Sequence, residues 1–363
     1  MSPRIKKTVI SMEALSSGAG LAILSALLFG ASTPLAKLLL RDIDAWMLAG
    51  LLYLGSGVGL IAVRSLVRAL GAGARSEAAL RAGEWPWLAL ATLSGGVVGP
   101  VLLMVGLAHT AATTAALLLN LEGVLTALLA WFVFRENFDR RIALGMAAII
   151  AGGFVLTWGG SFILSAVLGP LMIAGACLAW AVDNNVTRKV SQADPVQIAL
   201  LKGCVAGVVN VGIAIGFGST LPPLGSLSAA VVVGFAGYGV SLVLFVVALR
   251  HIGTARTGAY FSLAPFFGGL IAVLVLREPV TIQLVTAGFL MAIGVWLHLT
   301  ERHEHEHRHE EMTHEHRHVH DQHHQHSHDG SEPPGEPHSH WHVHAPLSHS
   351  HAHFPDIHHR HEH

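Results

Sequence analysis

The sequence predicts an all-α polytopic membrane protein: ten transmembrane helices arranged as two inverted five-helix repeats, followed by a disordered His-rich tail. Three observations lead to this fold class. Hydrophobic residues make up 52% of the 363-residue chain and charged residues only 12%. Apolar stretches of about 20 residues, the length that crosses a bilayer, recur along residues 18–300. The remaining segment, 301–363, holds 23 of the 26 histidines.

Ten apolar segments are long enough to cross the membrane as helices. Strands of a membrane barrel are about ten residues long and alternate in character, so continuous apolar runs of twice that length indicate helices. A cytoplasmic N-terminal segment, 1–17, precedes them. We place the spans at 18–40, 45–66, 86–107, 110–134, 140–160, 167–189, 196–217, 227–249, 254–276 and 280–300.

Basic residues concentrate in alternate loops, which predicts the orientation. Cytoplasmic loops of membrane proteins carry an excess of Lys and Arg. One side holds only Lys37, Arg41 and Arg277. The other side holds the N-terminal cluster and most of the remaining basic residues, among them Arg64, Arg68, Arg75, Arg81, Arg135, Arg140, Arg141, Arg188, Lys189, Lys202, Arg250 and Arg256. We therefore expect both termini in the cytoplasm, with the chain in a bacterial inner membrane.

An internal repeat divides the membrane region into two halves. The stretch GLAHTAATTAALLLNLEGVLTALLAWFVFRENF, from Gly106, aligns without a gap with ALRHIGTARTGAYFSLAPFFGGLIAVLVLREPV, from Ala248, at an offset of 142 residues. Upstream, LFGASTPLAK from Leu28 aligns with AWAVDNNVTR from Ala179 at an offset of 151. We assign the halves to 18–160 and 161–300.

Each half contains five predicted spans, an odd number, so the halves should lie in opposite orientations. Inverted repeats of this kind are typical of secondary transporters, which bind substrate near the midplane between the halves. The chain contains no G-x-x-x-x-G-K-[ST] phosphate loop and no H-E-x-x-H motif. We therefore expect a transporter driven by an ion gradient or by its substrate gradient, and no enzyme.

Both halves end in the same pattern, an Arg-Glu pair after the fourth helix and then a glycine-bearing helix. In LAWFVFRENFDRRIALG and IAVLVLREPVTIQLVTAG, this pattern resembles the EamA-type drug/metabolite transporter superfamily over nearly all of 18–300. The resemblance implies the fold but not the substrate. Histidine-tailed members associated with nickel and cobalt resistance resemble the chain more closely. A proline common in the fourth helix of each half is present as Pro265 but replaced by Gly123 in the first half.

Glu122 is the most informative residue of the membrane region. A charged side chain near the centre of a span costs about 2.5 to 3.5 kcal/mol on insertion scales, so it should face a partner or a wet cavity. Thr114 and Thr126 share its helical face. We predict that Glu122 binds a cation or exchanges protons; the alternative is a protonated or paired glutamate that fixes packing.

A second polar group interrupts the sixth span at Asp183, Asn184 and Asn185, with Trp180 one turn before. Together with Thr126, these residues could complete a substrate site around Glu122. The alternative is structural: Asp183 would pair with Lys37 or Arg188, and the asparagines would join helices by hydrogen bonds.

Other repeated residues have simpler expected roles. His109 and His251 begin equivalent spans at opposite faces, where they could guard the two openings of one pathway or merely anchor their helices. We expect Lys37 and Arg188 to reach toward headgroups. The Arg-Glu pairs at 135–136 and 277–278 should end their helices and set their depth.

The tail is predicted to bind a metal ion. Imidazole suits nickel, zinc, copper and iron, and at neutral pH much of it is deprotonated. The tail has 12 acidic residues against 4 arginines, is poor in hydrophobic residues and should not fold alone. The candidate ligands are His303, His305, His307, His309, His314, His316, His318, His320, His323, His324, His326, His328, His338, His340, His342 and His344.

Together these observations predict export of divalent transition-metal cations, nickel or cobalt first and zinc next, by alternating access. No cofactor is required, and the tail would hold nickel, cobalt or zinc. The expected partners are the lipid bilayer and a metal or small-molecule substrate, with no nucleic acid. Two alternatives stay open: a drug, metabolite or amino-acid exporter with a metal-buffering tail, and a membrane metal sensor or storage protein without transport.

Overall fold

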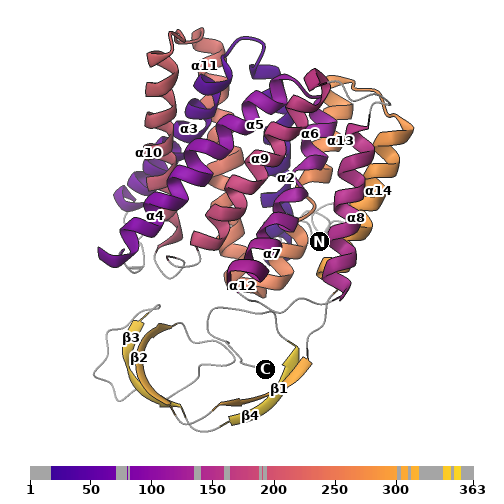
Figure 1. Ribbon diagram of the computed structural model, residues 1–363. Coiled ribbons are helices and arrows are strands. Elements are labelled where there is room, and N and C mark those ends of the chain that lie inside the picture. Colours follow the sequence, from indigo (N-terminus) through magenta and orange to yellow (C-terminus); the bar gives the residue numbers. More distant parts are fainter. Residues whose placement is uncertain are drawn as a thin grey trace, which may run out of the picture.

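The computed structural model shows a bundle of long helices with short strands beyond its lower end (Figure 1). It describes residues 18–70, 80, 82–134, 140–158, 164–187, 190 and 194–300, together with four tail segments, 304–309, 312–318, 338–344 and 347–352. From 18 to 300, every regular element within the described residues is helical.

Within its described residues, the first half contains seven α-helices and two short helical variants. These are α2 (Gly18–Leu39), α3 (Ala45–Ala69), the 3₁₀ helix η1 (Ala82–Glu84), α4 (Trp85–Ala91), the π-helix η2 (Thr92–Val98), α5 (Gly99–Ala108), α6 (Ala112–Leu118), α7 (Leu121–Phe134) and α8 (Arg140–Thr157).

The second half contains α9 (Leu164–Thr187), α10 (Pro195–Gly216), α11 (Leu224–Gly234), the π-helix η4 (Phe235–Val240), α12 (Ser241–Phe261), α13 (Ala264–Leu276) and α14 (Ile282–Leu299). It differs from the first half at α12, because this single helix covers the positions equivalent to α5 and α6.

Nine helical segments of the described chain are long and apolar enough to cross a membrane. Their outer surface is apolar: Phe132, Phe154 and Phe289 are each about two-thirds exposed, as expected for side chains that face lipid. The tenth predicted span corresponds to α14, whose apolar part is shorter. The structure therefore shows a multi-pass membrane protein with nine candidate spans, and the tenth stays a prediction.

The eighth and ninth predicted spans, 227–249 and 254–276, agree with the apolar segments Leu224–Ala248 and Thr257–Leu276. The helix itself does not break between them: α12 runs from Ser241 to Phe261, and the chain breaks at Ser262 and Leu263. Backbone hydrogen bonds within a helix do not depend on polarity, so the polar residues Arg250 and His251 do not end it.

Two irregularities recur at equivalent positions of the halves. Adding the offset of 142 to η2 gives 234–240, and η4 occupies Phe235–Val240. The break between α6 and α7 at Leu119 and Asn120 likewise maps to within one residue of the break between α12 and α13. Both halves are thus interrupted in their fourth helix, just before Gly123 and Pro265. The first half therefore keeps the break of its fourth helix, although it has Gly123 where the second half has Pro265.

Glycines allow two of the long helices, α3 and α10, to approach closely. Along α3 and α10, a Cβ atom added to Gly57 would lie 2.6 Å from the backbone nitrogen of Cys204, and one added to Gly207 would lie 2.6 Å from that of Leu54. Small residues at such contacts bring backbones together and favour helix packing within a bilayer. The close packing fixes α10 against α3 along most of their lengths.

Four segments of the tail form strands, where the sequence predicted no regular structure. β1 (Glu304–His309) pairs antiparallel with β4 (Leu347–Ala352), and β2 (Met312–His318) pairs antiparallel with β3 (His338–His344). The H-x-H pattern has a period of two, the period of a strand. The register sets five histidine pairs directly opposite each other: His305 and His351, His307 and His349, His314 and His342, His316 and His340, and His318 and His338.

Two further predicted ligands, His309 and His344, lie opposite Leu347 and Met312. The remaining predicted tail ligands lie outside the described residues. These are His303, His320, His323, His324, His326 and His328.

Candidate substrate site

Glu122 lies at the helix break of the first half, in the first turn of α7. The chain leaves α6 through a tight turn in which the backbone N–H of Glu122 donates to the carbonyl of Leu119 at 3.1 Å. The buried Asn120 fastens this turn by donating to the carbonyl of Leu117 at 2.9 Å. The break places the carboxylate at the start of a half-helix, the position where discontinuous transporter helices form substrate sites.

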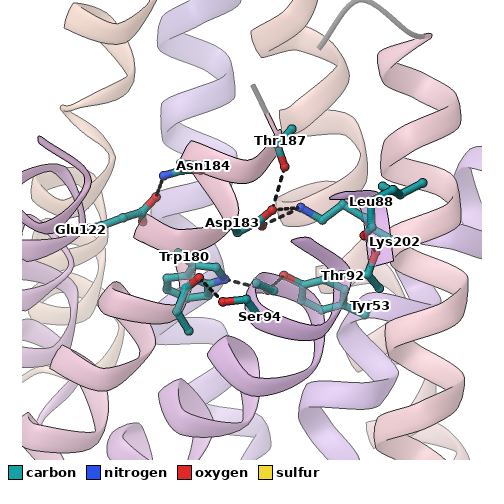
Figure 2. A network of polar contacts seen from close by, with 12 residues as sticks. Tyr53, Leu88, Thr92, Ser94, Glu122, Trp180, Asp183, Asn184, Thr187 and Lys202 are labelled. Carbon is teal, nitrogen blue, oxygen red and sulfur yellow. Dashed lines mark hydrogen bonds and ion pairs between the residues drawn. The ribbon is translucent and has the colours of Figure 1, made fainter. Parts of the chain in front are cut away.

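Asn184 of α9 is the direct partner of Glu122. Its amide nitrogen donates to Glu122 Oε1 at 2.8 Å and lies 3.4 Å from Thr126 Oγ1 (Figure 2). Asn184 is exposed, and Glu122 and Thr126 are half-buried. Within the described part of the chain, no basic side chain forms an ion pair with Glu122. The group therefore presents an uncompensated carboxylate with neutral oxygen and amide partners.

Asn185 has a structural role. Only 4% of it is exposed, and its amide nitrogen donates to the carbonyls of Thr126, at 3.2 Å, and Ala181, at 2.8 Å. These bonds join α9 to α7, as the structural alternative predicted. Asn185 thus holds the two helices that carry the Glu122 and Asn184 pair.

Asp183 forms a buried ion pair with Lys202 of α10. The ammonium group lies 2.7 Å from Oδ1 and 2.5 Å from Oδ2, and the hydroxyl of Thr187 donates to Oδ1 at 2.8 Å. The two charged side chains are 10% and 16% exposed. Asp183 thus pairs with Lys202, which was not among its predicted partners. Lys37 donates to backbone carbonyls instead, and Arg188 lies outside the described residues.

The two carboxylates do not converge on one site. Figure 2 shows Glu122 meeting Asn184 on one side of α9, while Asp183 points away from it toward Lys202. Among the described residues, no group of three or more His, Cys, Asp or Glu side chains could hold a metal ion. In this conformation Glu122 is the carboxyl group of the site without a basic partner in the described chain, and Asp183 is paired with Lys202.

Trp180 supports the π-helix η2. It is 7% exposed, and its indole N–H donates to the carbonyl of Gly95 at 2.9 Å. Tyr53 of α3 donates to the same carbonyl at 2.8 Å, and Ser94 ties η2 to the carbonyl of Ala179 at 2.6 Å. A π-helix leaves carbonyls without their usual α-helical donors. Here side chains of α3 and α9 donate to the carbonyl of Gly95 instead.

Gly95 also admits the buried carboxylate. A Cβ atom at Gly95 would overlap the side chain of Asp183. The equivalent glycine of η4 is Gly237, and a Cβ atom there would lie 2.7 Å from Cβ of Ser32. Ser32 aligns with Asp183 at the offset of 151. Each of these two contacts, which we call glycine junctions, sets a π-helix glycine of one half against a side chain of the other half. Only α9, in the second half, contributes a charged side chain, Asp183.

Lys37 and Glu278 clamp the turn between α5 and α6. The ammonium group of Lys37 donates to the carbonyls of Leu107, at 2.6 Å, and Ala108, at 3.2 Å. The carboxylate of Glu278 accepts from the backbone N–H groups of Ala112, at 2.7 Å, and Thr113, at 2.8 Å. A cation thus caps the end of one helix and an anion the start of the next. These roles replace the predicted headgroup contact of Lys37 and depth-setting role of Glu278.

The predicted gates do not occupy matching places. His109 follows α5 as an exposed residue of the clamped turn, whereas His251 lies inside the continuous helix α12. His251 nevertheless lies between two candidate spans, Leu224–Ala248 and Thr257–Leu276, so the gate hypothesis stays a prediction.

Comparison with known proteins identifies the family. The EamA-like transporter family matches residues 16–158 and again residues 167–300. The chain belongs to the EamA-like transporter family. The two matched segments coincide closely with the halves inferred from the repeat, and together they cover most of the membrane region.

Two relatives of this EamA protein are described as transporters. An uncharacterized transporter of Methanothermobacter thermautotrophicus is 31% identical over 287 residues, which cover 76% of this chain and 84% of the relative. The uncharacterized transporter YyaM of Bacillus subtilis is 25% identical over 214 residues, 55% of this chain and 70% of the relative. Neither name states a substrate. The EamA protein is therefore a membrane transporter whose substrate must be inferred from its own residues.

A solved structure shares the fold. It is described only as a crystal structure of a protein, with a TM-score of 0.58 and 21% identity, and the match covers 77% of this chain and 98% of the solved chain. At this identity the likeness concerns the fold alone.

Proposed function

We propose that this EamA protein exports a divalent transition-metal cation, nickel or cobalt before zinc, from the cytoplasm. The carrying observation is the carboxylate of Glu122, which lies at a helix break beside Asn184 without a basic partner in the described chain. A charge in the membrane interior is costly and usually serves a substrate or proton pathway. The carboxylate and the side-chain oxygens of Asn184 and Thr126 offer a cation a weak site that it can leave again.

Alternating access is the proposed mechanism. The two halves would rock against each other, and the interrupted fourth helices would supply the movable segments. Glu122 would bind the cation in one state and a proton in the other, so that the proton gradient drives export. Asp183 and Trp180 would position the site from behind, by holding α9 against α10 and η2.

The tail would gather the metal at the entrance. The register of β1 with β4 and of β2 with β3 sets histidines opposite one another, and opposite residues of an antiparallel pair lie on the same face. An isolated two-stranded ladder is marginally stable in water, so metal binding would stabilise the paired form. The basic loops predict that both termini, and therefore the tail, lie in the cytoplasm.

A metabolite exporter is the second candidate, favoured by a chain of aromatic rings through the core. Centroids of neighbouring rings lie 4.9 to 5.8 Å apart along Tyr53, Tyr238, Phe29, Phe261 and Phe245. Such rings contact organic cations and aromatic molecules more readily than hydrated metal ions. In that case Glu122 would bind an ammonium group, and the tail would only buffer or sense metal.

Metal content of cells tests the proposal. Nickel, cobalt and zinc would be measured in metal-challenged cells that carry the full chain, Glu122→Gln, a chain ending at Thr300, or no gene. Asp42→Asn is the matched control, because its carboxylate lies outside the spans and contacts only Ser226 in the described chain. We expect lower metal with the full chain and Asp42→Asn, and the no-gene level with Glu122→Gln.

Equal metal content in all strains would refute metal export and favour the metabolite exporter. Flux of radioactive nickel into inverted vesicles separates transport from sensing or storage, because a storage protein binds metal without flux. The chain ending at Thr300 shows whether the tail contributes.

A further inference from the structure

A pocket outside the candidate substrate site lies between the end of α3 and the start of α10. Its volume is about 330 Å³, and it is lined by Ile61, Arg64, Ser65, Arg68, Gln197, Leu200 and Leu201. The two helices are held together by their glycine contacts. The pocket therefore lies at one end of a closely packed helix pair.

The walls of the pocket carry positive charge. Arg64 and Arg68 stand one helical turn apart on α3, so their side chains share a face. Arg64 is oriented by an ion pair with Asp194, 3.3 Å away, while Arg68 is exposed and has no charged partner among the described residues. Ser65 and Gln197 add neutral donors. Two arginines against one carboxylate leave the pocket attractive to an anion.

Below these polar groups both helices present apolar side chains on their outer surface. On α3, Val58 is 54% exposed and Ile61 is 43% exposed. On α10, Val205 is 51% exposed and Val208 is 62% exposed. Val58, Ile61 and Arg68 follow a helical spacing of three and seven, so the apolar stripe of α3 leads directly into the basic end of the pocket.

We propose that this pocket binds the headgroup of an anionic phospholipid, whose acyl chains lie along the stripes of α3 and α10. Basic pockets between transmembrane helices are suited to anionic headgroups, and Arg presents a planar set of donors that fits a phosphate. A free phosphate would use the arginines but would leave the apolar stripes without a role. The combination of charge and apolar surface selects a lipid.

The test compares lipids retained by the full-length protein. The protein is reconstituted in vesicles with equal parts of phosphatidylglycerol and phosphatidylcholine, extracted in mild detergent, and weighed with its bound lipids by native mass spectrometry. The wild type should retain phosphatidylglycerol over phosphatidylcholine, and Arg68→Gln should reduce that preference about fivefold, the size expected for one basic group near an anionic headgroup. Arg68→Gln leaves the Arg64 and Asp194 pair intact, so the variant should fold.

Arg141→Gln is the matched control, because Arg141 lies on the same predicted membrane side but outside the pocket. An unchanged preference in Arg141→Gln supports the pocket. An equal loss in both variants would overturn the proposal, since it would indicate general surface charge. Inorganic phosphate at millimolar concentration is added in a further arm. Arg68-dependent phosphate binding without lipid retention would also overturn it.

Discussion

The buried ion pair between Asp183 and Lys202 allows a quantitative test of the structure. Lys202→Met keeps the length of the side chain and removes its charge. The carboxylate would then remain 10% exposed with only the hydroxyl of Thr187 as a partner. Removing one partner of a buried pair typically costs about 3 to 5 kcal/mol, because the other charge stays buried and unpaired. We expect the unfolding free energy of Lys202→Met to fall by that amount.

The double variant separates the interaction free energy of the pair from the cost of leaving one buried charge without a partner. In Asp183→Asn/Lys202→Met, both charges are gone, and asparagine has the shape that the space beside Gly95 accepts. We expect the double variant to recover at least about half of the loss seen in Lys202→Met, which is a coupling of about 2 kcal/mol. The assay is reversible unfolding of the purified protein in mixed micelles. The single variant Asp183→Asn completes the comparison. If the loss in the double variant equals the sum of the losses in Lys202→Met and Asp183→Asn, the side chains do not interact and the pairing is refuted.

Further substitutions test other contacts. Gly95→Ala would push its methyl group into the paired carboxylate and should lower both thermal stability and transport, whereas Gly212→Ala, which has open space around it, should be neutral or stabilise α10 by up to about 1 kcal/mol. Ser25→Ala removes a buried hydroxyl that donates to the carbonyl of Ser241 at 2.7 Å and should cost about 0.5 to 2 kcal/mol in micelle unfolding. Loss of stability in Gly212→Ala, or none in Ser25→Ala, would contradict these contacts. Glu278→Gln weakens the cap of α6 and should cost about 1 kcal/mol, with faster local hydrogen exchange at the start of α6 as the measurement; unchanged exchange would refute the cap.

The hydrophobic pattern predicted most of the helices because each span must satisfy its backbone hydrogen bonds internally. It does not predict where the helices themselves break. The predicted spans separate at Arg250 and His251, as do the apolar segments of the structure, yet the helix α12 passes through both residues. Conversely, the breaks near Asn120 and Ser262 lie in apolar surroundings, and the periodicity of the sequence gives no sign of them.

The candidate site was predictable in its residue types but not in its partnerships. Glu122 and Asp183 were singled out because carboxylates are costly within spans. Their actual partners, Asn184 and Lys202, depend on how α7, α9 and α10 pack, which a single sequence does not reveal. Lys202 had been counted only as a basic residue near a membrane face. The signal that could have found it is the short distance along the chain: Lys202 ends the second turn of α10, the helix that follows the one carrying Asp183.

The same limit explains why the contacts of Lys37 and Glu278 with the turn after α5 could not be predicted. Lys37 and Glu278 lie 241 positions apart, and each was interpreted from its own helix end. Their targets are backbone groups of a third segment, and backbone groups leave no mark in a sequence.

The uneven charge of the two glycine junctions has a consequence for the transport cycle. In a protein with two similar halves, the inward-open and outward-open forms would have nearly equal energies if the junctions were identical. Here the junction of Gly95 includes an ion pair, while that of Gly237 includes only Ser32. If rocking loosens one junction as it tightens the other, every 1.4 kcal/mol of difference between them shifts the resting populations tenfold. In the alternating-access cycle proposed above, the side on which the empty transporter rests would then depend on a single lysine.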